Sequence, residues 1–262
     1  MKKKIIPLII SAFLAMTACG STEAAVESTS ETTQTQTEAE SIVAVTALSY
    51  EIDPEKPLVA LTFDDGPNNT TTVQVLDILE KYQVPASFFL VGNNINAASE
   101  DVVKRAYDMG CEIDNHSKTH SYMNQMTKEE IAEEVSYVSD KVKEITGEPT
   151  KFFRPPYIAV SNEMYEAIDM PFICGAGCND WDPKVTVQQR IDNTLKQVKD
   201  GTIILLHDAV GNSQTVEALD TIIPSLLDEG YQFVTVSEMF ETKGIEISAD
   251  DANLYTVVQK LS

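Results

Sequence analysis

The chain has 262 residues, of which 43% are hydrophobic, so it can bury the core of one large domain without stabilising disulfides or metals. Its formal net charge is −22 at pH 7, which argues against a nucleic-acid-binding surface and favours a neutral or cationic partner. The simplest explanation of so acidic a composition is solubility.

The first 19 residues are typical of a bacterial lipoprotein signal peptide. Lys2, Lys3 and Lys4 precede the apolar run IIPLIISAFLAM, which is too short for a comfortable transmembrane span. The next residues, MTACG, resemble a lipobox in which cleavage leaves a lipid-modified Cys19 at the new N-terminus, although Met16 stands where leucine is usual. We therefore expect an extracytoplasmic protein anchored by lipid to the outer face of the cell membrane. The alternative is an ordinary signal peptide with an incidental cysteine.

A change of composition marks the start of the folded part. Residues 20–46 are rich in Ser, Thr, Glu and Gln and contain no aromatic residue, so they predict a disordered tether. Residues 47–245 predict a single folded domain, and residues 246–262 a C-terminal extension that either packs on the domain or frays.

From residue 47 onward, short apolar runs alternate with segments whose apolar residues recur every three or four positions. The first strand is expected at 56–63 and the first helix at 70–84, where Val75, Leu76 and Leu79 share one face. The helix at 128–147 begins with a capping box formed by Thr127 and Glu130. Further strands are expected at 86–92, 111–116, 151–157, 171–177 and 202–208, further helices at 99–110, 186–201 and 213–230, and a final strand and turn at 231–240.

This alternation predicts an α/β domain with a mostly parallel sheet, and about seven strand–helix units favour a barrel. In a barrel, catalytic residues collect at the C-terminal ends of the strands. All three histidines of the chain follow predicted strands, and three together favour a functional site over a structural role. The polar or aromatic residues at these strand ends are Asp64, Asp65, His116, His120, Arg154, Asp180, Trp181, His207 and Asp208.

Two of the histidines indicate a metal site. His116 and His120 are separated by three residues, a spacing that lets two imidazoles reach one cation. A catalytic zinc takes three protein ligands and keeps one position for water. We expect the third ligand to be a carboxylate, because Cys19 belongs to the anchor and the other three cysteines are scattered along predicted strands. Either Asp64 or Asp65 fills this role, and the other is then placed to act as general base for the water.

The motifs TFDDGP, HSKTH, RPPY, DW and LLHD occur in this order between residues 57 and 240. In order and separation they resemble the five motifs of the polysaccharide deacetylases, carbohydrate esterase family 4, which include bacterial peptidoglycan N-acetylglucosamine deacetylases. The resemblance implies a distorted (β/α)7-type barrel with one catalytic domain at 47–245. It also implies hydrolysis of N-acetyl or O-acetyl groups on a carbohydrate polymer with a divalent metal, usually zinc, with cobalt or nickel as alternatives.

The resemblance assigns roles to individual residues. Asp64 resembles the catalytic base, and Arg154 the arginine that holds this base by a charge-assisted hydrogen bond. His207 resembles the catalytic acid, and Asp180 the carboxylate that orients it and raises its pKa. The positions that resemble the metal ligands are Asp65, His116 and His120.

The resemblance also assigns residues to substrate binding. Tyr157 stands where the family offers a backbone N–H to the oxyanion, and it follows Pro155 in the same motif. Trp181 and Leu205 stand where the family walls a small pocket for the acetyl methyl group.

Four positions depart from the family pattern, and one of them is Cys111, which stands where histidine is frequent. Ile158 stands where glycine usually follows RPPY, and Gly177 where another aspartate is frequent. Asp114 stands where glycine is common, so it either tunes or crowds the metal site or contacts only solvent. In an exported protein, Cys174 and Cys178 predict either a small disulfide or two reduced thiols.

These residues favour an enzyme, since base, acid and metal ligands are all present. We expect it to remove N-acetyl groups from N-acetylglucosamine residues of peptidoglycan and release acetate, because an anchored protein outside the membrane meets that polymer first. O-acetylated xylan or another acetylated glycan is the alternative substrate, and a non-catalytic glycan-binding homologue is the alternative class. We expect a monomer whose only other partner is the membrane, through Cys19, with no nucleic acid.

Overall fold

The computed structural model describes residues 47–259. The predicted signal peptide with Cys19 and the predicted tether at 20–46 lie outside these residues. Among the described residues, no helix has the length and apolar character needed to cross a membrane. Residues 47–259 belong to one compact unit, and the part of the extension after residue 245 that is described belongs to it too.

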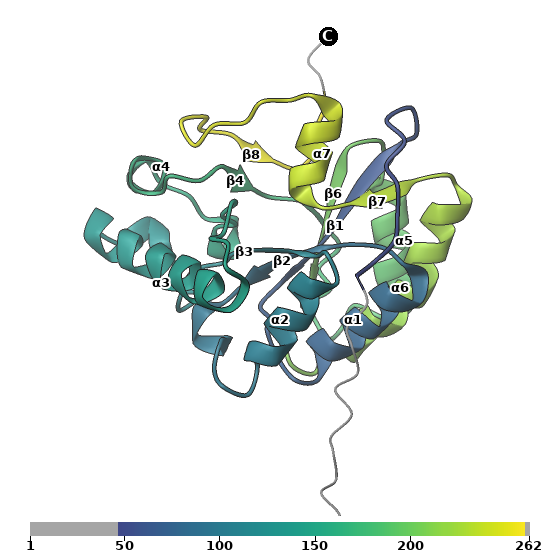
Figure 1. Ribbon diagram of the computed structural model, residues 1–262, viewed down its shortest axis with the longest axis horizontal. Helices are drawn as coiled ribbons and strands as arrows, with labels where there is room; N and C mark the ends of the chain where they lie inside the picture. The colour runs from purple at the N-terminus through teal and green to yellow at the C-terminus, as the bar shows by residue number, and fades with distance from the viewer. Residues whose placement is uncertain (1–46, 260–262) are drawn as a thin grey trace, which may run out of the picture. The chain divides into compact units, whose positions relative to one another are not determined.

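The centre of the domain is a parallel sheet (Figure 1). In spatial order its strands are β3 (Glu112–Asn115), β2 (Ser87–Leu90), β1 (Leu58–Asp64), β6 (Thr202–His207) and β5 (Ala176–Gly177). A further strand, β7 (Gln232–Val234), pairs with the N-terminal half of β1, whereas β2 pairs with its C-terminal half. The carboxyl ends of β1 and β6 lie in register, with Asp64 opposite His207.

Single bridges close this sheet into a distorted barrel. Phe153 bridges Asn115 at the end of β3 and Phe172 in β4 (Phe172–Ile173). The chain then passes through residues 174 and 175 into β5, which pairs with β6. The extension contributes β8 (Leu254–Tyr255), which pairs with β4, so this part packs rather than frays. The expectation of a distorted barrel formed by a single domain is confirmed.

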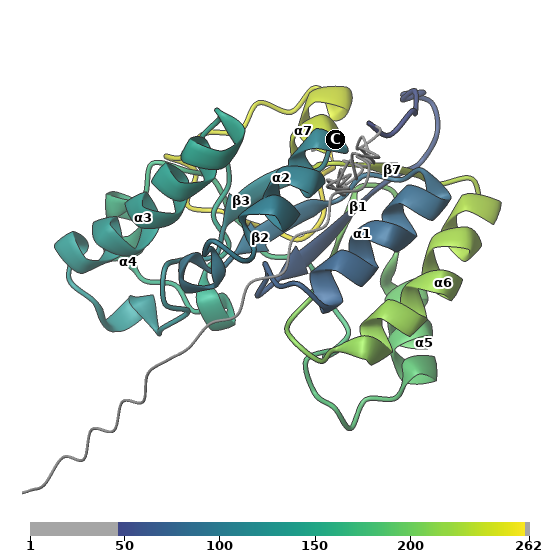
Figure 2. The same cartoon turned by 60° about the horizontal axis from the view of Figure 1, so that its bottom comes forward.

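Helices cover the outside of the barrel (Figures 1 and 2). The layer consists of α1 (Thr71–Tyr82), α2 (Glu100–Asp108), α3 (Lys128–Thr146), α4 (Asn162–Ala167), α5 (Val187–Gln197) and α6 (Ser213–Asp228), which contact one another in the order α5-α6-α1-α2-α3-α4. A seventh helix, α7 (Val236–Lys243), packs against β1. Short 3₁₀ turns occur at η1 (Gly92–Asn94), η2 (Met123–Gln125) and η3 (Pro156–Ile158). The capping box predicted at Thr127 and Glu130 is present.

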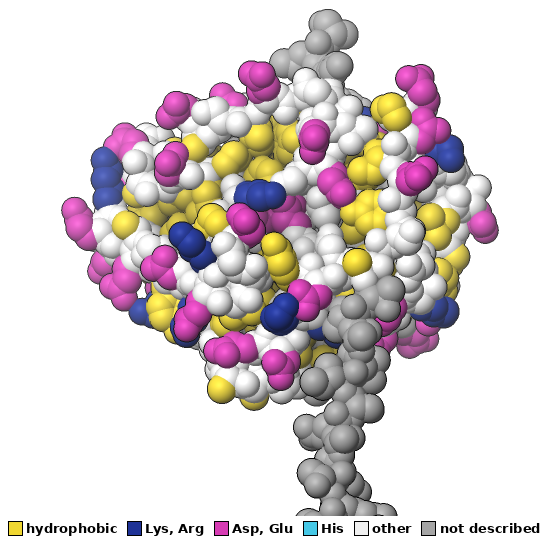
Figure 3. Space-filling model, viewed as in Figure 1, with side chains coloured by type: hydrophobic (Ala, Val, Ile, Leu, Met, Phe, Trp, Pro, Cys, Tyr) yellow, Lys and Arg dark blue, Asp and Glu magenta, His cyan; other side chains and the backbone are white. Residues whose placement is uncertain are grey.

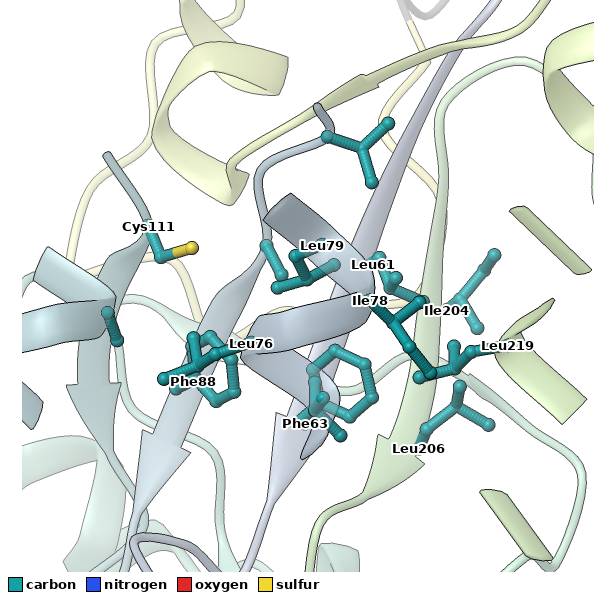
Figure 4. Packing of buried hydrophobic residues seen from close by; sticks show 14 of the residues in the cluster. Leu61, Phe63, Leu76, Ile78, Leu79, Phe88, Cys111, Ile204, Leu206 and Leu219 are labelled. Carbon is teal, nitrogen blue, oxygen red and sulfur yellow. The ribbon is translucent and has the colours of Figure 1, made fainter. Parts of the chain in front are cut away.

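Side chains of β1 alternate between two apolar clusters. Leu61 and Phe63 pack with Leu76 of α1 in the larger cluster, under the helices (Figure 4). Ala60 belongs to a second cluster on the opposite face of the strand. Because side chains alternate with a period of two, Asp64 also lies on the face away from the helices. The regular strand thus directs this carboxylate toward the barrel interior.

Two predicted strands are interrupted. In the segment 151–157 only Phe153 forms bridges, because Pro155 and Pro156 have no N–H to donate to a neighbouring strand. The segment 171–177 divides into β4 and β5 around Gly175, whose φ of 129° is incompatible with an extended strand. A Cβ atom at Gly175 would lie 2.7 Å from the Cβ of Leu205, so only glycine fits this close approach.

Two further expectations need correction. The turn predicted after the last strand is the helix α7, and it begins with a capping box of Thr235 and Glu238. This T-x-x-E spacing is itself a helix signal, which the apolar run around it obscured. Cys174 and Cys178 are free thiols, so the disulfide alternative is wrong and the reduced alternative holds.

Candidate active site

A cavity of 740 Å³ opens at the C-terminal ends of the strands. Nine of the eleven predicted site residues line it. The other two, Arg154 and Asp180, are completely buried behind the cavity wall, where Arg154 contacts Asp64 and His116 and Asp180 contacts His207. The predicted residues on the wall are Asp64, Asp65, His116, His120, Pro155, Tyr157, Trp181, Leu205 and His207.

On one side of the cavity, Asp64 is paired with an arginine. Its Oδ1 accepts a hydrogen bond of 2.5 Å from Nη1 of Arg154, and its Oδ2 lies 3.6 Å from Nε2 of His116. The Arg154 guanidinium lies over the ring of Phe89 at 4.0 Å. Burial raises the pKa of Asp64, but the positive charge of Arg154 and the nearby histidines outweigh it, so the pKa lies below its ordinary value. Asp64 is therefore ionised at neutral pH, and Oδ2 is available to accept a proton.

Beside it, Asp65, His116 and His120 form a group that could hold a metal ion. Their ligand atoms all lie within 4.8 Å of one another. Nδ1 of His116 donates a 2.7 Å hydrogen bond to the backbone carbonyl of Arg154, which leaves Nε2 free to ligate. Burial lowers the pKa of His116, against the effect of the nearby aspartates, so the ring is neutral. Two imidazole nitrogens and one carboxylate oxygen fit a three-ligand zinc site with an open position.

His207 also lines this cavity and is held by a buried carboxylate. Its Nδ1 donates to Oδ1 of Asp180 at 2.8 Å, and its backbone N–H donates to Oδ2 at 2.8 Å. Burial lowers the pKa of His207, but the hydrogen bond and charge of Asp180, together with the more distant Asp64 and Asp65, raise it to about 9. His207 is therefore an imidazolium at neutral pH. It lines the cavity and can donate a proton through Nε2.

Left-handed backbone is concentrated around this cavity. Because Asp65 has a φ of 77°, the chain leaves the strand at this residue, and the carboxylates of Asp64 and Asp65 both reach the cavity. Gly66 follows because a Cβ atom there would lie 2.6 Å from Oδ2 of Asp208. Backbone strain of this kind is typical of functional sites. Five of the seven described non-glycine residues with positive φ line the cavity: Asp65, His120, Tyr157, Ile158 and Asn179.

The four departures from the family pattern lie in different surroundings, and Cys111 is buried in the larger apolar cluster. Ile158 and Gly177 line the cavity, and at Gly177 there is room for a side chain, since the nearest atom to a Cβ there is Cδ2 of Leu205 at 3.9 Å. Asp114 does not line the cavity and is completely buried. Its Oδ1 accepts hydrogen bonds from the backbone N–H groups of Lys151 and Phe152. Neither alternative expected for Asp114 is therefore correct, because it contacts neither the metal group nor solvent.

Three further polar residues support the site: Asp208, which was noted at a strand end but given no role, and Thr215 and Asn212, which were not predicted. Thr215 in the first turn of α6 donates to Oδ2 of Asp180 at 2.7 Å, and Asn212 donates to the His207 carbonyl. Asp208 accepts from Thr72 beneath the Asp64–Gly66 turn, and burial, with the charges of the site, raises the pKa of Asp208 to about 7. The available signal was the run of polar residues between the LLHD motif and the apolar face of α6.

Known proteins resemble the chain in both sequence and fold. A family model described as polysaccharide deacetylase matches residues 51–171. A peptidoglycan-N-acetylglucosamine deacetylase of Bacillus cereus is 36% identical over 204 residues, which cover 75% of this chain and 94% of that protein. The chain therefore belongs to the polysaccharide deacetylase family, as its motifs predicted, and to the hydrolases.

Two other relatives are connected with xylan. A bifunctional xylanase/deacetylase of Pseudobutyrivibrio xylanivorans is 52% identical over 188 residues, which cover 72% of this chain. The match covers 31% of that relative, so the chain spans about a third of its length. A family 4 acetyl xylan esterase from Clostridium thermocellum, solved with a cobalt ion, is 42% identical with a TM-score of 0.75 and covers 77% of this chain and 98% of that one.

Proposed function

We propose that this chain is a metal-dependent deacetylase that acts on an acetylated polysaccharide outside the cell. O-acetylated xylan is the substrate that we propose it prefers. The observation that carries the proposal is the arrangement of charges around one cavity. Asp64, a carboxylate of lowered pKa, and His207, an imidazolium, line the same cavity as the group that could hold a metal. Base and acid in these states are what the hydrolysis of an acetyl group requires.

The residues of the cavity divide the reaction between them. A divalent ion held by Asp65, His116 and His120, most simply zinc, would supply Lewis-acid polarisation of the acetyl carbonyl and of the attacking water. Asp64 takes a proton from the water at Oδ2 while Arg154 holds Oδ1. His207 gives its proton to the leaving group while Asp180 fixes its orientation. The Tyr157 N–H stabilises the oxyanion, and Trp181 and Leu205 surround the methyl group.

The preference for xylan rests on similarity and charge. The relatives whose names mention xylan are 52% and 42% identical to this chain, whereas the peptidoglycan deacetylase is 36% identical. Acidic side chains are spread over the face of the molecule in Figure 3, consistent with the net charge of −22. Such a surface favours a neutral polymer such as xylan over an anionic cell wall.

Peptidoglycan is the second candidate, because the deacetylase of Bacillus cereus matches over 94% of its length. To decide between them, the full-length protein would be loaded with Zn²⁺, Co²⁺ or Ni²⁺ and assayed for acetate release. The substrates are acetylated xylan, chitooligosaccharides and peptidoglycan. We expect kcat/KM to be at least about 10-fold higher on xylan, the factor given by about 1.4 kcal/mol of differential transition-state binding. Faster release from peptidoglycan would reverse the order, and no release with any metal would favour a glycan-binding protein.

The extracytoplasmic location is a separate part of the proposal. It is supported by the apolar run and by the MTACG motif, which contains Cys19. Mass spectrometry of the mature N-terminus should find a lipid-modified Cys19. A mature chain that begins at Gly20 or later without lipid would contradict the anchor, while leaving the proposed chemistry unaffected.

A further inference from the structure

The turn at residues 155–158 forms one wall of the cavity in an unfavourable backbone conformation. Tyr157 has φ 58° and ψ 12°, and the next residue, Ile158, has φ 55°. Left-handed backbone is unfavourable for residues with a Cβ atom and most unfavourable for β-branched ones. Two such residues in succession persist only when their surroundings hold them in place.

Within the turn, the support comes from two backbone hydrogen bonds. The Ile158 N–H donates to the Pro155 carbonyl at 2.9 Å, and the Ala159 N–H donates to the Pro156 carbonyl at 3.1 Å. Both bonds are local, so they do not fix the turn relative to the rest of the site.

The support from outside the turn is an aromatic stack. The ring of Tyr122 lies parallel to that of Tyr157, with centroids 4.0 Å apart and an angle of 15° between the planes. Tyr122 directly precedes Met123, which is buried in the same cluster as Phe153, so its backbone is anchored in the core. On the other side, Tyr157 makes an edge contact with His120, at 4.6 Å between centroids.

We propose that Tyr122 is a positioning residue for the proposed deacetylation: it holds the 155–158 turn in its reactive shape by stacking on Tyr157. Pro155, Tyr157 and Ile158 line the cavity, whereas Tyr122 does not, so Tyr122 acts through Tyr157. The inference rests on the proposed function for its kinetic consequences, but the stacking itself does not depend on it.

Tyr122 also permits a clean experiment. It is 51% exposed, and Tyr157 is 54% exposed, so removing the Tyr122 ring takes little from the core. Tyr122→Ala should therefore fold with a Tm near that of the parent. Tyr122→Phe keeps the ring and is the matched control.

The kinetic arm compares these variants on a small acetyl ester and on acetylated xylan. Tyr122→Ala should lower kcat about 10-fold on both substrates, which is the factor expected from the loss of a strong aromatic pair interaction. Tyr122→Phe should retain nearly full activity. Glycine adopts left-handed backbone without strain. In an Ile158→Gly background, Tyr122→Ala should therefore cost at most about 3-fold, since less of the turn's conformation depends on the stack.

The second arm does not require activity. Hydrogen exchange measured by mass spectrometry should show faster exchange of the peptide that contains residues 157–159 in Tyr122→Ala and not in Tyr122→Phe. If the parent releases no acetate, the proposed function fails, and this arm alone decides whether Tyr122 holds the turn.

Three results would overturn the inference. A loss confined to xylan, with the small ester unaffected, would make Tyr122 a sugar-binding residue. A loss restored by excess metal would mean that Tyr122 acts on the ligand His120 instead. Unchanged exchange at residues 157–159 would show that the stack does not support the turn.

Discussion

Two buried carboxyl groups of the same barrel have opposite electrostatic surroundings. Asp64 is 2% exposed and Asp114 is 0% exposed, so burial raises the pKa of both. At Asp64 the charge of Arg154 outweighs burial, and the pKa falls below its ordinary value. At Asp114 burial and the charge of Glu112 outweigh two backbone N–H donors, and the pKa is well above its ordinary value. The difference shows that the neighbouring charge, rather than depth of burial, decides which carboxyl is ionised.

The same contrast separates the site from the rest of the barrel. At the site, the buried carboxylates of Asp64 and Asp180 each have a cationic partner, Arg154 for Asp64 and His207 for Asp180. On β3, Asp114 accepts only backbone N–H groups, and its Oδ2 has no hydrogen-bond partner among the described residues. One arrangement maintains charges for catalysis, and the other maintains a carboxyl that is neutral over a wider pH range.

The sharpest distinction within the site is between its two adjacent aspartates. Asp64→Asn keeps the shape of the side chain but removes the base, so it should bind zinc like the parent and lose roughly 10²–10⁴ in rate. Asp65→Asn removes a charged ligand, so it should bind zinc more weakly and regain activity in excess zinc. Metal content and turnover would be measured on the same preparations. Loss of zinc from Asp64→Asn with retention in Asp65→Asn would reverse the two roles.

Removing the counter-charge should make the surroundings of Asp64 resemble those of Asp114. Arg154→Met leaves the carboxylate buried without its partner, which typically costs about 3–5 kcal/mol of stability. Chemical denaturation of metal-free protein would measure this cost. The matched control is Arg105→Met on α2, whose bridges to Asp77 and Glu80 are on the surface and should contribute at most about 1 kcal/mol. Equal losses in the two variants would contradict the comparison.

The pairing of Asp180 with His207 should appear in the pH dependence of activity. An acid must be protonated to act, so the parent should lose activity as pH rises through about 9, the pKa of His207. Asp180→Asn removes the charge that raises this pKa, so the basic limb of the pH–rate profile should move to lower pH. The rate at pH 8 should then fall roughly 10-fold. Thr215→Val, which removes one hydrogen bond to Asp180, should shift the limb less. An unchanged limb in Asp180→Asn would show that Asp180 only supports the loop.

The smallest effect is expected at Asp114. The pKa of Asp114 is higher in the folded than in the unfolded chain, so protonation of Asp114 stabilises the fold. This stabilisation is fully present below the unfolded-state pKa of about 4 and is lost as pH rises through the folded-state pKa. Asp114→Asn lacks this loss, so its Tm relative to the parent should rise with pH. A gain of about 1 kcal/mol would correspond to roughly 2–4 °C. Asp140→Asn, at an exposed position on α3, is the control and should show no such trend. A Tm difference independent of pH would mean that Asp114 is ionised when folded.

The sequence alone was sufficient to predict the class of fold and the residues that form the candidate site. Alternating strand and helix patterns predicted the barrel, because each pattern depends on residues that are neighbours in the chain. The polar residues at the strand ends were identified for the same reason. Of the eleven residues to which the strand ends and the family motifs assign a role, nine line one cavity and the other two lie behind it. Closure of the barrel through Phe153 was not predictable, since it rests on single bridges between distant segments.

Tertiary structure decided how these residues behave. The two aspartates of the TFDDGP motif reach one cavity because the chain leaves the strand at Asp65, whose φ is 77°. The pKa of Asp64 is lowered by Arg154, which is 90 residues away in the chain. Asp114 stands just two positions before His116, a histidine that could ligate a metal, yet it is bonded to the backbone of Lys151 and Phe152. Left-handed backbone and counter-charges depend on contacts between segments far apart in sequence, and no local pattern records them.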